Sequence, residues 1–150
     1  YESKIINAGR SINDKMGEYV AEKILGHLAL HNGHLKDAKV LVMGATFKED
    51  VTDIRNSKVA DIIQHLLKSG LTVHVTDPQA SSDKLHHEYG FGLTGELAND
   101  YEAVIIAVPH AEYKDMDGSY FEGITKPNAI IADLKGIYRS KNFSRKYWSL

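Results

Sequence analysis

Apolar and polar residues follow one another along this chain in blocks whose period changes from helical to strand-like. The first block covers residues 3–31. Its apolar residues recur at spacings of three, four and seven: Ile5, Ile12, Met16, Tyr19, Val20, Ile24 and Leu28. This spacing predicts one long helix, for which Asn32-Gly33 is a typical end. We expect only part of so long a stripe to pack on one small domain and the rest to contact a partner. The alternative, a helix folded back wholly onto its own domain, stays open.

Short apolar runs then alternate with helical patterns. The predicted strands are 40–43, 72–76, 103–108 and 129–134, and the predicted helical segments are 57–69, 82–89, 96–100, 110–114 and 119–124. Such alternation is typical of α/β proteins with a mainly parallel sheet. Residues 141–146 are interpreted as a basic connector with solvated charges, which leads into an aromatic tail.

The polar loop after the first predicted strand carries the candidate chemistry. Lys48 and Arg55 lie seven residues apart in it, just before the helix that begins near Ser57. Ligands of open α/β sheets bind beyond the carboxyl ends of the strands, and two cations there suit an anionic ligand. In the alternative, both cations are solvated and paired with the nearby acids. The residue chemistry alone leaves the two open.

Two features that resemble dinucleotide sites are not predicted to be such sites. Residues 90–95 match G-x-G-x-x-G, but a polar helical pattern precedes them where the motif needs a strand, and no long helix follows. Asp77 ends the second predicted strand, where a ribose-binding acid would lie. However, Thr46 and Phe47 stand in the first turn in place of glycines. We interpret Asp77 as a turn residue before Pro78.

Composition excludes several classes of function. A formal net charge of −2 without basic runs argues against nucleic acid. No apolar run approaches the roughly 18 residues of a membrane span and no signal peptide is present, so we expect a cytoplasmic protein. Without cysteine the chain has neither disulfide nor thiol nucleophile. His27, His31 and His34 have metal-like spacing, but no carboxylate completes the set, and no metal site is predicted.

The loop resembles a known signature. Residues 44–50, GATFKED, and 53–57, DIRNS, are similar to the G-x-x-F-K-x-(D/N)…D-x-R-x-S pattern of the UDP-glucose/GDP-mannose dehydrogenase family. In that family the pattern opens the C-terminal UDP-sugar-binding domain. The resemblance implies a Rossmann-like three-layer α/β domain in residues 34–150. It makes residues 1–33 the end of the central dimerisation helix. Because the chain starts at Tyr1 rather than Met, we expect it to be a fragment.

The same resemblance implies an activity for the parent protein. The family oxidises the C6 alcohol of a nucleotide sugar to a carboxylate in two hydride transfers to NAD. It uses a cysteine and an N-terminal NAD domain, and neither is found in this sequence. The segment 133–136, DLKG, and the aromatic C-terminus are similar to members that oxidise UDP-N-acetylhexosamines for bacterial surface polysaccharides.

For single residues, the resemblance implies that Phe47, Lys48 and Lys135 contact the UDP-sugar and that Arg55 contacts NAD. It implies no catalytic residue in this chain, and a homodimer formed through residues 3–31. His110 follows the third predicted strand and could face the same crevice, although we favour a capping role for it. Two alternatives stay open: a non-catalytic nucleotide-binding module, and a dimerisation module in which Lys48 and Arg55 only pair with acids.

Overall fold

The fold is an α/β domain preceded by a long helix. A computed structural model describes residues 4–31, 33 and 35–150, with side chains from residue 15 onward. The helices are α1 (Lys4–His31), α2 (Lys58–Lys68), α3 (Ser82–Tyr89), the short 3-10 helix η1 (Ala111–Tyr113) and α4 (Gly118–Ile124). The strands are β1 (Lys39–Met43), β2 (Thr72–Thr76), β3 (Tyr101–Ile106), β4 (Thr125–Asp133) and β5 (Lys146–Ser149).

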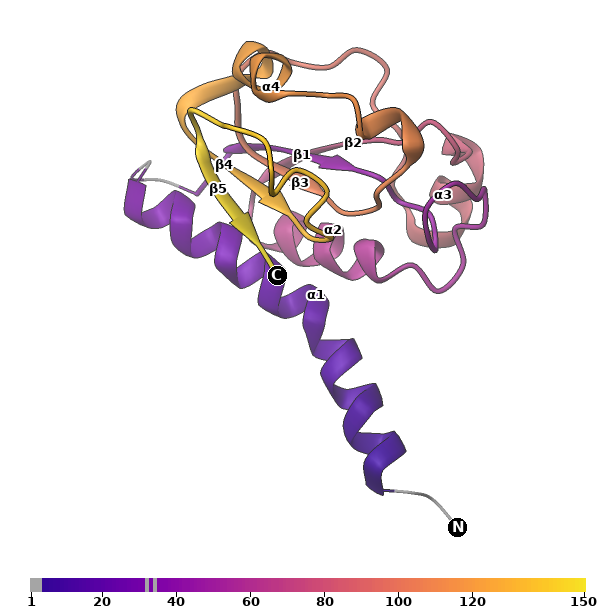
Figure 1. The fold of residues 1–150 in the computed structure, drawn as a ribbon. Coiled ribbons are helices and arrows are strands. Elements are labelled where there is room, and N and C mark those ends of the chain that lie inside the picture. The colour runs from indigo at the N-terminus through magenta and orange to yellow at the C-terminus, as the bar shows by residue number, and fades with distance from the viewer. Residues whose placement is uncertain (1–3, 32, 34) are drawn as a thin grey trace.

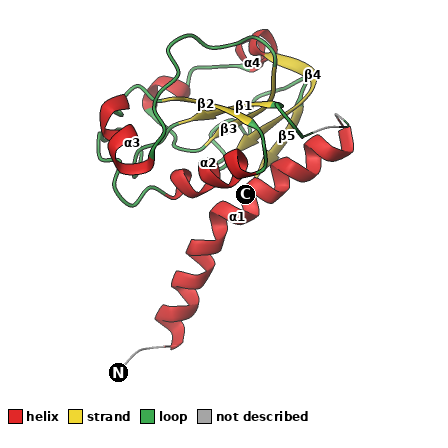
Figure 2. Ribbon diagram, turned by 180° about the vertical axis from the view of Figure 1, so that it is seen from behind, coloured by secondary structure: helices red, strands yellow, loops and turns green. Residues whose placement is uncertain are grey.

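All five strands are parallel, and their order in the sheet is β2-β1-β3-β4-β5. Helices α1 and α2 cover one face of the sheet, and α4 lies over the other (Figures 1 and 2). These three layers confirm the predicted Rossmann-like α/β fold. The end of β2 and the bounds of α3 agree with the sequence prediction.

Two hydrophobic cores lie on opposite faces of the sheet. Along β1, Val40 and Val42 join the core under α1 and α2, whereas Leu41 and Met43 join the core under α4. Because both faces of a parallel sheet are covered, its central strands carry unbroken apolar runs, 40–43 in β1 and 103–106 in β3. This explains the continuous apolar runs in the sequence.

The second half of α1 belongs to the domain core. Val20, Ala21, Ile24 and Leu28 are fully buried. A Cβ added at Gly17 would lie only 2.9 Å from the Cβ of Asp61, so a glycine there permits close packing on α2. Towards its N-terminus α1 reaches beyond the sheet (Figure 1). In the described part of the chain, no helix combines the length and apolarity needed to cross a membrane.

The C-terminal segment differs from the prediction. Residues 146–149 form a fifth strand beside β4, with Trp148 and Tyr147 packed against opposite cores. The charges of the connector are not merely solvated. The ammonium of Lys141 donates to the carbonyls of Lys114 and Met116, and Arg145 Nε donates to Thr125 Oγ1. These contacts join segments far apart in the sequence, so local pattern could not reveal them.

Three other boundaries also differ. The predicted helical turn at 96–100 is wrong: this segment is a loop, in which Ala98 N–H donates to the Tyr101 hydroxyl. Just before it, Thr94 N–H donates to the Val75 carbonyl. Strand β3 begins two residues earlier than predicted, and β4 four residues earlier, at Thr125. Pairing of Tyr101 with Thr125 accounts for both shifts.

The carboxyl ends of the strands lie in register. Met43 is paired with Thr76 on one side and with Ile106 on the other, and Asp133 is paired with Ile106 and with Ser149. The loops that follow β1, β2, β3 and β4 therefore all start from one edge of the sheet. This edge is where α/β domains of this type bind ligands.

Candidate functional site

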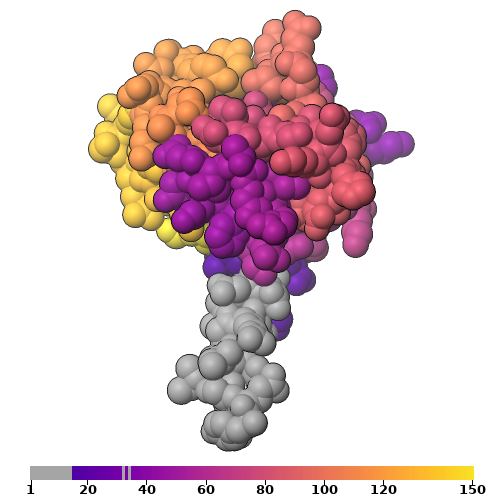
Figure 3. Space-filling model, turned by 90° about the vertical axis from the view of Figure 1, so that its right-hand side faces the viewer, coloured from indigo at the N-terminus to yellow at the C-terminus, as the bar shows by residue number. Residues whose placement is uncertain are grey.

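The loop of residues 44–57, between β1 and α2, is the centre of the candidate site. Figure 3 looks onto the face that carries it. There the loop, in purple, lies between the segment around α3 and the segments that follow β3 and β4, in orange to yellow. The loop closes on itself because Phe47 N–H donates to the Asp53 carbonyl over 2.6 Å.

The backbone of this loop explains several residues of its pattern. Gly44 has φ +96°, and a Cβ there would lie 2.6 Å from the Cβ of Val108, so only glycine fits. Asp50 and Asn56 also have positive φ, of 60° and 57°. Among residues other than glycine, Asp and Asn tolerate this conformation best. The glycine, aspartate and asparagine at these positions are therefore explained by the turns that the loop makes.

Asp77 ties the loop to the end of β2. Its Oδ1 accepts the N–H groups of Gln79 and Ala80, which confirms the predicted turn role. Its Oδ2 accepts Ala45 N–H over 2.6 Å and lies 2.9 Å from His110 Nε2. One buried carboxylate thus holds its own turn and the start of the 44–57 loop.

His110 lies in the interior and not at the surface of the crevice. It occupies the N-cap position of η1, but its side chain makes no cap hydrogen bond, so the predicted capping role is wrong. The fully buried ring instead contacts Asp77, Thr46 Oγ1 at 3.2 Å and the backbone N–H of Asp50 at 3.0 Å. Only the fold brings these segments together.

Asp133 plays the corresponding role at the end of β4. It is fully buried and accepts the N–H groups of Gly136, Ile137 and Tyr138 as well as the Tyr147 hydroxyl. Burial and the Asp133 charge raise the pKa of Tyr147. The carboxylate fixes the turn that presents Lys135, which is exposed.

The predicted substrate contacts are exposed on two loops of one edge. Phe47 is 55% exposed, an unusual state for so large a ring, and Lys48 next to it is exposed. Neighbouring strands lie about 4.8 Å apart, so the starts of the Lys48 and Lys135 loops, two strands apart, are separated by roughly 10 Å. Among the described residues neither ammonium has an ion-pair partner. Both are available to an anion, although the structure shows no contact between them.

Arg55 has a different environment. Its Nε and Nη2 donate to Asp53 Oδ1 and Oδ2 over 3.1 and 3.0 Å, and its N–H also donates to Oδ1. These hydrogen bonds hold the pKa of Asp53 at about 2, below its usual 3.8. The pairing that the alternative interpretation predicted therefore holds for Arg55. It does not hold for Lys48, which has no ion pair among the described residues; the Asp50 carboxylate accepts Ala111 N–H.

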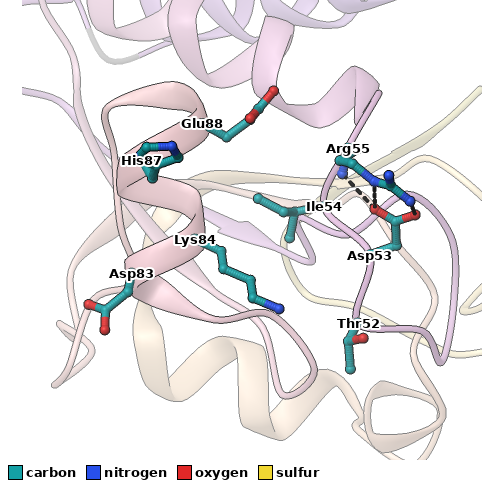
Figure 4. Close-up of a pocket in the computed structure, with 8 residues that line it drawn as sticks. All are labelled: Thr52, Asp53, Ile54, Arg55, Asp83, Lys84, His87 and Glu88. Atoms are coloured by element: carbon teal, nitrogen blue, oxygen red, sulfur yellow. Dashed lines mark hydrogen bonds and ion pairs between the residues drawn. The ribbon is translucent and has the colours of Figure 1, made fainter.

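A cavity of about 620 Å³ lies between this part of the loop and α3. In Figure 4, Ile54 and Lys84 extend into the space between the two walls, and the Asp53–Arg55 pair stands at its rim. The lining residues are Thr52, Asp53, Ile54, Arg55, Asp83, Lys84, His87 and Glu88. Phe47, Lys48 and Lys135 do not line this cavity, so Arg55 is the one predicted contact residue that does.

The glycine motif at 90–95 and His27, for which no ligand site was predicted, have structural roles. Gly90 ends α3 with φ +84°, and residues 91–100 form a loop, so the strand and long helix that a dinucleotide motif needs are absent around 90–95. His27 Nε2 bonds the Asn128 carbonyl, and His34 lies outside the described residues. Within those residues no three His, Cys, Asp or Glu side chains gather as metal ligands would.

Fold and site together define a Rossmann-like ligand-binding domain with exposed cations at the carboxyl edge of its sheet. Residues 41–140 match the UDP-glucose/GDP-mannose dehydrogenase family, UDP binding domain. The chain belongs to this family.

Individual relatives agree with this assignment. The chain is 38% identical over 136 residues to a UDP-N-acetyl-D-glucosamine 6-dehydrogenase of Pseudomonas aeruginosa, an alignment of 90% of this chain and 32% of the relative. It is 36% identical to Protein CapL of Staphylococcus aureus, across 100% of this chain and 36% of that protein. The structure of the UDP-N-acetyl-mannosamine dehydrogenase Cap5O from S. aureus superposes with a TM-score of 0.78 at 29% identity. That superposition covers 97% of this chain and 32% of Cap5O. The chain thus spans about a third of the length of these relatives.

The stabilisation contributed by the Asp53–Arg55 pair should depend on pH. Because the folded-state pKa of Asp53 is depressed, the stabilisation from this pair is present above about pH 3.8 and is lost as the pH falls through about 2. Arg55→Ala should raise the pKa of the Asp53 carboxyl towards 3.8, measured by NMR titration of its carboxyl carbon. Asp117, whose pKa is lowered by hydrogen bonds from Ser119 and Tyr120, serves as the control and should titrate unchanged. An Asp53 midpoint that stays near 2 in the variant would contradict the pairing.

Proposed function

We propose that this chain is the C-terminal UDP-sugar-binding part of an NAD-dependent nucleotide-sugar 6-dehydrogenase. The parent enzyme would oxidise the C6 alcohol of a UDP-N-acetylhexosamine, or of UDP-glucose, to the uronate in two hydride transfers. The family match over residues 41–140 supports this proposal, as do relatives named UDP-N-acetyl-D-glucosamine and UDP-N-acetyl-D-mannosamine dehydrogenases. Bacterial polysaccharide biosynthesis is the setting that we infer for it.

The observation that carries the proposal is the exposed group Phe47, Lys48 and Lys135 at the carboxyl edge of the sheet. A nucleoside diphosphate sugar combines a base and a sugar with two phosphates. Ammonium groups bind phosphate as compact charges, and an exposed ring offers an apolar surface to a base or sugar. We infer that these three residues contact the UDP-sugar.

Arg55 is proposed to contact NAD. Asp53 engages Nε and Nη2, which leaves the Nη1 edge of the guanidinium without a described partner. A guanidinium that one carboxylate holds in place is already oriented to donate hydrogen bonds to a phosphate group. Arg55 lines the α3 cavity and Lys48 does not, which supports a second ligand for Arg55. NAD would be bound mainly by a domain outside this chain.

The chain holds no candidate for the covalent step of the reaction. It contains no cysteine, and no residue in it is proposed as catalytic. We therefore propose that this chain alone does not reduce NAD and that its part in the enzyme is to bind and orient substrate. A cytoplasmic location is proposed with the function.

We further propose a division into a helical segment, residues 1–33, and a binding domain, residues 34–150, with homodimerisation through residues 3–31. The burial of Val20, Ile24 and Leu28 in the domain core leaves less of that helix for a second subunit. Among the described apolar side chains of α1, those of Tyr19 and Leu30 are more than half exposed, at 55% and 78%. We infer that the dimer contact uses the part of α1 that reaches beyond the sheet (Figure 1).

The substrate contacts can be tested with this chain and UDP. A hydrogen bond to a charged group contributes on the order of 1.5–3 kcal/mol, or roughly 10- to 150-fold in affinity. Lys48→Ala and Lys135→Ala should each weaken UDP binding by about that factor in isothermal titration. Lys68→Ala, at the exposed end of α2, is the matched control and should bind as the unaltered chain does. If the lysines are only structural, the melting temperature will fall while the UDP affinity stays the same.

The same titration in the complete dehydrogenase separates the two ligands. Arg55→Ala should weaken NAD and leave the UDP-sugar nearly unaffected, and Lys48→Ala should do the reverse. Equal losses for both ligands in both variants would mean that the 44–57 loop collapses as a unit, and the proposed division of roles would be wrong.

Self-association is tested by sedimentation of this chain. We expect a dimer, because α1 reaches beyond the sheet and Ile5 and Ile12 continue the apolar stripe of its sequence there. Removing residues 1–14 should yield a monomer with a nearly unchanged melting temperature, since that cut spares the buried residues of α1. A shortened chain that still dimerises would place the interface elsewhere.

A further inference from the structure

His110 is a fully buried ionisable side chain for which neither the fold nor the proposed ligand contacts give a role. It follows β3, yet its ring lies between the ends of β2 and β1. Nε2 is 2.9 Å from Asp77 Oδ2 and 3.2 Å from Thr46 Oγ1, and Nδ1 is 3.0 Å from the backbone nitrogen of Asp50. Three loops of the candidate site thus meet at one imidazole.

The contacts determine where the proton lies. The Asp50 backbone N–H is a donor only, so Nδ1 must accept and carries no proton. The proton is then on Nε2 and is donated to the Asp77 carboxylate. Thr46 Oγ1 uses its own proton on the Lys48 carbonyl, over 2.8 Å, so towards Nε2–H it can only accept. The ring is therefore neutral, with both nitrogens engaged.

Other charged or polar groups around the ring fit this assignment. Asp50 Oδ1 is 4.0 Å from Nδ1 and is itself engaged by Ala111 N–H at 2.9 Å. The Tyr113 ring packs edge-on with centroids 5.7 Å apart. Asp50 is thus held twice by consecutive residues, through its own N–H by His110 and through its carboxylate by Ala111.

We propose that His110 is a positioning residue for the UDP contact. As the neutral Nε2–H tautomer it bridges Asp77 to Asp50, and it also contacts Thr46, whose hydroxyl donates to the Lys48 carbonyl. In the chain, the exposed residues Phe47 and Lys48 lie between Thr46 and Asp50, the two loop residues that the ring holds. A loop ordered before binding spares the ligand the entropy of ordering it, which raises affinity. This inference rests on the proposed function, because it assumes that the ligand of Lys48 is UDP.

The first test needs neither ligand nor variant. NMR of the imidazole nitrogens in the unaltered chain should show the Nε2–H tautomer for His110. The Asp50 amide should exchange slowly with solvent although its residue is exposed. An Nδ1–H tautomer, or an Asp50 amide that exchanges as fast as a free loop amide, would overturn the proposal.

The second test compares two variants that each keep half of the bridge. The side-chain nitrogen of Gln stands near Nε2, so His110→Gln keeps the donor to Asp77 but loses the acceptor for Asp50. The side-chain oxygen of Asn stands near Nδ1, so His110→Asn keeps that acceptor. His110→Gln should weaken UDP binding by roughly 3- to 10-fold, the worth of one ordinary hydrogen bond. His110→Asn should bind UDP nearly as tightly as the unaltered chain does, even if its melting temperature is lower. His65→Gln, between α1 and α2, is the matched control and should bind UDP as the unaltered chain does.

A double substitution separates positioning from general damage. If His110 acts through Lys48, then His110→Gln should cost little further affinity once Lys48→Ala is present, because coupled sites are not additive. Full additivity, or affinity that only follows the melting temperature in both His110 variants, would overturn the proposal. Failure of the unaltered chain to bind UDP would overturn the proposed function together with this inference. A wrong tautomer would overturn this inference alone.

Discussion

Two buried carboxylates at the ends of strands hold the candidate site together. A charged carboxylate in a protein interior is costly unless hydrogen-bond donors surround it. Asp77 and Asp133 each have four: two or three N–H groups of the turn that follows, and further donors from a neighbouring segment. The need to satisfy each charge therefore fixes the turn after β2 or β4 and joins it to the next segment of the sheet edge.

The residues that hold the loops in place are therefore different from the residues that could contact a ligand. The acids that hold the loops are buried and fully hydrogen-bonded, whereas the ammonium groups of Lys48 and Lys135, on the loops after β1 and β4, extend into solvent without described partners. Arg55 is intermediate, since Asp53 holds one side of its guanidinium and leaves the other open. Fixed loops with free cations at the carboxyl edge of a parallel sheet suit the binding of a nucleotide diphosphate.

The sequence predicted what depends on local pattern. The parallel α/β architecture, the bounds of α3 and the turn at Asp77 follow from periodicity and from turn chemistry. It did not predict β5, whose pairing with β4 is non-local, nor the loop at 96–100, where Ala98 N–H donates to the Tyr101 hydroxyl. His110 was misjudged because its partners lie 33 to 64 residues away. One signal for Asp133 was present: like Asp77, it stands at the end of a predicted strand, just before a turn.

We propose that the loops after β1 and β4 bind the nucleotide together. Amide chemical-shift changes, mapped along this chain as UDP is added, test this proposal. The largest changes should fall in residues 44–50 and 134–137, with little change along α1 and β5. Changes confined to α1, β5 or the opposite edge of the sheet would contradict it.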